Sequence, residues 1–164
     1  SEMCIRDRPL YIIVLVISSS GFIASSVKAT DQRIAQITSE LSTQKVIQKH
    51  CDSYRLCRKV IEDCKSAKNP KAYRTKHQAE YQLHDSLKKE LQDLGITKIP
   101  SSNKIQKRIE HLESEQAATV REKQELQKKQ KTLDIIQQNF TALLNAPQIS
   151  NNDINRTVAP PLQH

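Results

Sequence analysis

Residues 105–140 read IQKRIEHLESEQAATVREKQELQKKQKTLDIIQQNF. Every seventh position in this stretch is apolar or small, and these positions are Ile105, Leu112, Thr119, Leu126, Leu133 and Phe140. Such a repeat is typical of a helix that packs along one stripe against another helix. The positions between them are mostly polar, namely Ile109, Gln116, Lys123, Gln130 and Gln137. A seam with so many polar positions is weak in a free-standing dimer, so we expect its partner to be another helix of the same chain.

A first long helix is expected upstream, beginning at Thr30 or Asp31 as its N-cap. Asn69 should end it, because the proline that follows pushes Asn69 out of the helical region. Spacings of three and four dominate its apolar stripe, which consists of Ile34, Ile37, Leu41, Ile47, Cys51, Tyr54, Cys57, Ile61 and Cys64. The stripe shifts in its second half, which predicts an imperfect supercoil there.

A shorter helix should lie between the two long ones, over residues 71–94, with Gly95 as its left-handed C-terminal cap. Ser101 or Ser102 should then cap the last helix, which should end near Ala146. The sequence therefore predicts an all-α fold, in which a long antiparallel, coiled-coil-like helical pair has a third helix packed at one end.

The composition agrees with thin helical packing rather than a thick globular core. Aromatic residues make up 4% of the 164 residues, and the chain has 2 glycines and no tryptophan. Lysine and arginine number 26 against 18 aspartates and glutamates, a formal net charge of +8 that favours an acidic partner. Candidate contacts to a nucleic-acid backbone are Arg55, Arg58, Lys59, Lys65, Lys68, Lys71, Arg74 and Lys76. The alternative is that these charges form a solvated surface with no partner.

No catalytic pattern is recognisable in the sequence. It contains no glycine-rich phosphate loop, no HExxH and no GxSxG, so we expect no enzyme, no catalytic residue, no cofactor and no metal. Cys51, Cys57 and Cys64 match no CxxC pair and should act as small apolar fillers, which fits a reducing, cytoplasmic setting. His77 and His84 are seven residues apart on one helix and should be partly buried packing residues.

The N-terminal residues allow two interpretations. Residues 1–8 look like a translated sequencing adapter, which would make them an artefact and the chain a piece of a longer protein. Read literally, Arg6 and Arg8, the apolar run in residues 10–17 and the small residues around Ala29 form a secretory signal peptide. The run alone is too short to cross a membrane, and it reads equally as a strand. Residues 9–29 are thus an apolar segment without an assigned function, residues 30–146 the helical region, and residues 147–164 a disordered tail.

One ordered set of positions is distinctive: Tyr54, Tyr73, His77, Leu83-His84, Leu87-Lys88, Leu91, Leu94-Gly95 and Lys98-Ile99-Pro100, followed by a long charged helix that ends in Ile135-Ile136 and Leu143-Leu144. This pattern resembles the C-terminal helical region of relaxases, the mobilisation nucleases of conjugative plasmids and integrative elements. It covers a little over half of the chain. The resemblance implies an accessory role, since the family's nicking chemistry resides in an N-terminal domain whose motifs have no match here.

The leading hypothesis is therefore a non-catalytic accessory region of a DNA relaxase in plasmid mobilisation. It would contact DNA phosphates, other relaxosome proteins or the secretion machinery in the cytoplasm, without a small-molecule substrate or a membrane. The alternative is an exported or membrane-tethered coiled-coil scaffold whose signal peptide is real.

Overall fold

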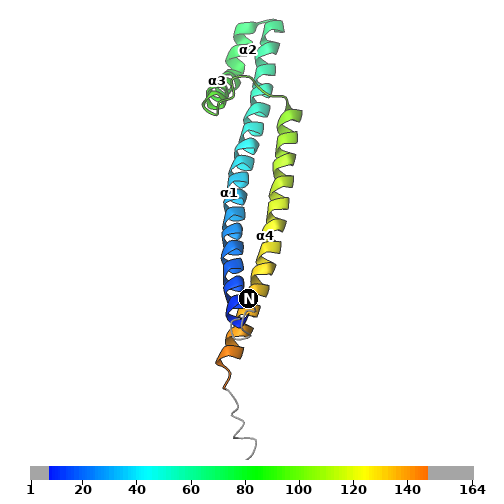
Figure 1. The fold of residues 1–164 in the computed structure, drawn as a ribbon. Helices are drawn as coiled ribbons and strands as arrows, with labels where there is room; N and C mark the ends of the chain where they lie inside the picture. The colour runs from blue at the N-terminus through cyan, green and yellow to red at the C-terminus, as the bar shows by residue number, and fades with distance from the viewer. Residues whose placement is uncertain (1–7, 148–164) are drawn as a thin grey trace, which may run out of the picture. The chain divides into compact units, whose positions relative to one another are not determined.

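Every regular element is helical in the computed structural model, which describes residues 8–147. Its elements, in chain order, are α1 (Arg8–Asp63), the 3₁₀ turn η1 (Cys64–Ser66), α2 (Pro70–Lys76), α3 (Gln78–Asp93) and α4 (Ser102–Asn145) (Figure 1). The predicted all-α class is confirmed. Residues 1–7 of the predicted adapter segment and residues 148–164 of the predicted tail lie outside the described range.

The chain divides into two compact units. Residues 28–124 form the first, which we call the hairpin unit. Among the described residues, the second contains residues 8–27 of α1 and residues 125–147 of α4. The two long helices therefore each contribute to both units.

α1 and α4 pair in antiparallel fashion within the hairpin unit (Figure 1). As residue numbers rise along α1, those of the partners on α4 fall. Contacts ordered in this way are Asp31–Lys123 at 2.5 Å, Thr38–Gln116 at 2.7 Å and Gln48–Gln106 at 2.9 Å. Lys123 and Gln116 are polar seam positions, and each finds its partner across the pair. The expectation of a partner helix within the same chain is confirmed.

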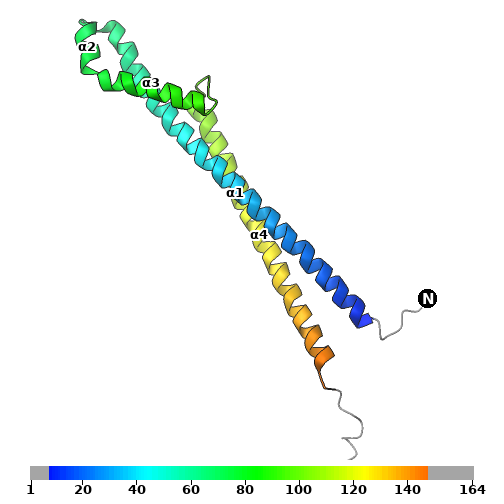
Figure 2. The same ribbon diagram turned by 90° about the vertical axis from the view of Figure 1, so that its left-hand side faces the viewer.

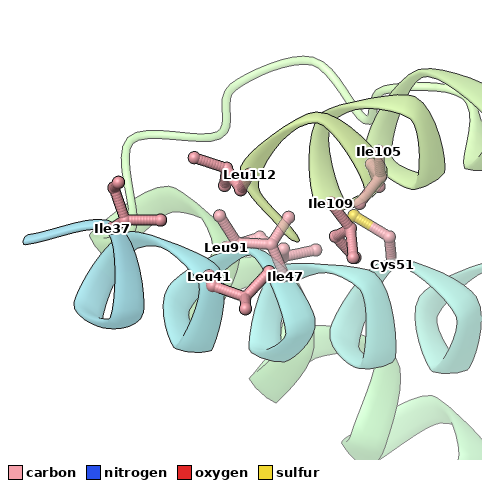
Figure 3. Close-up of a cluster of buried hydrophobic side chains, with 8 residues drawn as sticks. All are labelled: Ile37, Leu41, Ile47, Cys51, Leu91, Ile105, Ile109 and Leu112. Atoms are coloured by element: carbon pink, nitrogen blue, oxygen red, sulfur yellow. The ribbon is translucent and has the colours of Figure 1, made fainter. Parts of the chain in front are cut away.

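A single apolar cluster holds the hairpin unit together (Figure 3). It consists of Ile37, Leu41, Ile47 and Cys51 from α1, Leu91 from α3, and Ile105, Ile109 and Leu112 from α4. Full burial of a leucine or isoleucine side chain contributes about 1.5–3 kcal/mol. In Figure 2, α3 lies across α1 and leads through a short connection into α4. The third helix thus packs on the antiparallel pair, as predicted.

The predicted seam of α4 matches the burial pattern along that helix. Ile105, Ile109, Leu112 and Thr119 are buried. The remaining seam positions are half-buried, namely Gln116, Lys123, Leu126, Gln130, Leu133, Gln137 and Phe140. The buried hydroxyl of Thr119 donates to the carbonyl oxygen of Glu115 (2.8 Å), which satisfies it within the helix.

The start of the first helix is a correction. α1 begins at Arg8 rather than at Thr30 or Asp31, and Thr30 is a buried residue in its interior. In the sequence, Thr30 looks like a cap because it is a polar residue just before a repeating apolar pattern. In the structure, this pattern continues upstream of Thr30 through Ile23 and Val16. Residues 9–29 are accordingly helical and not a strand.

The second predicted helix is divided into α2 and α3 at His77, whose backbone leaves the helical region (φ −108°, ψ 27°). The break lets α3 change direction and lie against α1. Where the stripe of α1 shifts, α1 also faces α3: Ile47 belongs to the same buried cluster as Leu91, and Tyr54 stacks on His84. Beyond Ile47, α1 has two partners instead of one.

Gly95 ends α3 as predicted, with a positive φ of 78°. Its N–H donates to the carbonyl of Gln92 (2.9 Å), and the N–H of Ile96 donates to the carbonyl of Leu91 (2.8 Å). These two bonds make a Schellman motif, and Ile96 also packs against the core cluster. Ser101 caps α4 by accepting from the N–H of Lys104 (3.2 Å).

Candidate nucleic-acid interface

Local hydrogen bonds fix the segment between α1 and α3. The N–H of Ala67 donates to the carbonyl of Cys64 (3.3 Å) and closes η1. Asn69 then caps α2, since its side-chain oxygen accepts from the N–H of Ala72 (3.2 Å), and Pro70 occupies the first helical turn. α2 therefore begins a few residues after α1 ends, in a defined backbone conformation.

Five cations gather on this segment and form what we call the basic corner: Lys65, Lys68, Lys71, Arg74 and Lys76. All five are exposed. Within residues 8–147, none of them forms an ion pair with a carboxylate, in contrast to Arg58, which pairs with Glu62 at 2.8 Å. The charges of the basic corner are therefore available to an anion in solution.

Arg55, one of the predicted phosphate contacts, has a different role in the structure. Its guanidinium donates to Asp52 Oδ1 (2.7 Å), to Ser102 Oγ (2.6 Å) and to the carbonyl oxygen of Pro100. The side chain is half-buried. Arg55 thus joins α1 to the start of α4, and three of its five N–H donors are already used.

The eight predicted cations are consequently not equivalent. Arg58 is exposed but held by Glu62, and Lys59 is exposed without a carboxylate partner among the described residues. Lys59 and the basic corner are thus the predicted contacts that are exposed and not paired with a carboxylate of residues 8–147. The three-residue spacing of Asp52 and Arg55 indicates their pairing in the sequence, but nothing there indicates the contacts to Pro100 and Ser102, which are 45 and 47 residues away.

A shallow depression adjoins the basic corner and went unnoticed in the sequence. Its lining consists of Lys71, Arg74, Thr75, Gln78, Tyr81, Gln82 and Asp85. The guanidinium of Arg74 lies 5.0 Å from the centroid of the Tyr81 ring. A hydrogen bond with Cys64 and burial both raise the pKa of Tyr81, so its phenol stays protonated and neutral. In the sequence, the seven-residue spacing of Arg74 and Tyr81 indicates that the two side chains can meet on one helix face. The helix nevertheless breaks between them, at His77.

Histidines pack α3 and α2 into place. His84 stacks on Tyr54 of α1 with ring centroids 4.6 Å apart, and His50 of α1 lies 3.4 Å from Glu90 of α3. His77 is a half-buried residue, and its side chain bonds Glu80 (3.1 Å). This hydrogen bond lowers the pKa of Glu80. The predicted packing role of His77 and His84 is confirmed.

The cysteines behave as the expected apolar fillers. Cys51 and Cys57 are buried, and Cys64 is half-buried. Burial raises the pKa of the Cys51 and Cys57 thiols, which keeps them protonated. Within residues 8–147, no group of three or more His, Cys, Asp or Glu side chains is arranged to hold a metal ion.

Several positions that carry the resemblance to relaxases lie where α3 docks on the hairpin. Leu87 and Leu91 are buried, Gly95 supplies the helix cap, and the carbonyl of Pro100 accepts from Arg55. These residues stabilise the fold, so a partner would have to be bound by exposed residues elsewhere. No protein family, curated protein or solved structure matches the chain.

Proposed function

We propose that this chain is a non-catalytic helical module that contacts the phosphate backbone of DNA through the basic corner, as an accessory region of a relaxase would. The observation that carries the proposal is the accessibility of five cations on one short segment, none of which is paired with a carboxylate of residues 8–147. Phosphate oxygens receive a large share of protein–DNA hydrogen bonds, and arginine and lysine side chains are among their donors. The cross-helix contacts of α1 and α4 hold the fold that presents this segment.

Such binding has a recognisable physical signature. Each neutralised phosphate releases condensed counterions, so the logarithm of the binding constant falls with the logarithm of salt concentration by about 0.9 per contact on duplex DNA. Sequence contributes little, because phosphates are the same at every base pair. Arg74 contributes a guanidinium, which presents several N–H donors to a phosphate, beside the lysines of the basic corner.

The test is a salt titration of binding to duplex DNA of arbitrary sequence, with the full chain and with the triple variant Lys68→Ser, Lys71→Ser and Arg74→Ser. Loss of three contacts should reduce the slope by roughly 2–3 units. A matched control removes the same charges from exposed positions of α4, through Lys107→Ser, Arg121→Ser and Lys129→Ser.

The proposal requires that the two triple variants differ. An unchanged slope in the corner variant would contradict it. An equal reduction in both variants would show attraction to the net charge of the whole chain instead of contacts at the basic corner.

A further inference from the structure

The DNA-contact proposal gives no role to the N-terminal third of α1. Residues 9–27 contain no Asp, Glu, Lys or Arg, and they are bounded by Arg8 on one side and Lys28 on the other. α1 holds in this region a window that is long and apolar enough to cross a membrane. The run of residues 10–17, which is too short to cross a membrane alone, is therefore only the first part of a longer uncharged segment.

The apolar side chains of this segment are on all sides of the helix. Val16 is buried, whereas the exposed large side chains are Leu10, Tyr11, Ile12, Val14, Leu15, Ile17 and Phe22. Val14 is 59% exposed and Phe22 is 74% exposed. A helix on a soluble surface shows one apolar stripe and a polar opposite face, whereas a helix that is apolar all round belongs in a core or in lipid. A core helix would be buried, and this one is not.

The length of the segment identifies the environment. Residues 10–27 rise by roughly 27 Å at 1.5 Å per residue, close to the roughly 30 Å hydrocarbon core of a bilayer. Arg8 and Lys28 stand at the two ends, where charged side chains reach the lipid headgroups. We propose that residues 10–27 span a lipid bilayer and anchor the hairpin unit to it.

An anchor keeps residues 10–27 attached to the hairpin unit, whereas a cleaved signal peptide loses them, so the mass of the chain distinguishes the two. α1 runs without interruption through Ala29, the predicted cleavage position, and Asp31 two residues later is paired with Lys123 of α4. The α4 part of the second unit is unsuited to lipid, since Lys128, Lys129 and Lys131 are exposed there. In the anchored state, lipid replaces this part of α4 beside residues 10–27, and this part of α4 stays in water.

The test is made on the full chain produced in bacterial cells. Membranes are collected and washed with alkaline carbonate, which removes proteins bound by charge alone, and the mass of the retained chain is measured. The variant Val14→Lys with Ile17→Lys places two charges within the span. The control Val46→Lys with Leu56→Lys makes the same change at exposed apolar positions of α1 in the hairpin unit.

An anchor predicts that the uncleaved chain and the control remain in the washed membranes, and that the Val14→Lys, Ile17→Lys variant moves to the soluble fraction. A retained or secreted product that begins after Ala29 would overturn the proposal in favour of a signal peptide. Full-length chain in the supernatant, or equal retention of both variants, would also overturn it. These outcomes are independent of DNA binding at the basic corner.

Discussion

Leu91 packs α3 against both long helices. Its side chain is 1% exposed within the core cluster, and it lies among residues of α1 and α4. Leu91→Ala removes three buried carbon atoms, a loss of roughly 2.4 kcal/mol at about 0.8 kcal/mol per CH₂. The cavity left behind adds to this, so we expect α3 to lose about 3–5 kcal/mol of docking free energy.

Hydrogen exchange of the α3 amides measures this change directly. A loss of that size should speed exchange in α3 by roughly two to three and a half powers of ten, at about 1.4 kcal/mol per power of ten. Leu83→Ala is the matched control, because it makes the same substitution on the same helix at a position that is 47% exposed. It should change exchange severalfold at most. Equal rates in the two variants would show that α3 does not depend on the cluster.

Two further predictions concern the ends of α3. Gly95→Ala should destabilise the α3–α4 connection by roughly 1–2 kcal/mol, because φ is 78° there and a Cβ meets no other atom, so the cost is purely conformational. Urea unfolding should show a smaller loss for Gly95→Asn, and equal losses would indicate another cause. The Glu80 carboxylate accepts from His77, so its folded pKa lies below the ordinary 4.5. This bond therefore contributes stability above pH 4.5 that is lost as pH falls through the lowered pKa. An NMR titration midpoint at or above 4.5 for Glu80 would refute this.

Periodic features of the chain were predictable from the sequence. The α4 seam, the Gly95 cap and the Ser101 cap each follow from a few neighbouring residues, since helix packing and capping are local in sequence. The lysines and Arg74 of the basic corner were also found on an exposed surface, because charged side chains without partners stay in water.

Features that depend on distant partners were not predictable in the same way. In the sequence, Arg55 looks like an ordinary surface cation. In the structure, the connection between α3 and α4 places Pro100 and Ser102 beside it. The break at His77 has no proline or glycine to announce it in the sequence. The start of α1 was missed because an apolar run of residues 10–17 does not by itself distinguish a strand from a helix.

The antiparallel register of the hairpin unit determines how it responds to force. Lys28 and Gln124 are the two ends of that unit. They lie at the same end of the antiparallel pair, next to the Asp31–Lys123 contact. Tension between them loads one cross-helix contact at a time, beginning with this ion pair and proceeding toward Arg55. Under such tension we expect the pair to open from the Asp31–Lys123 end and to close again from the end near Arg55.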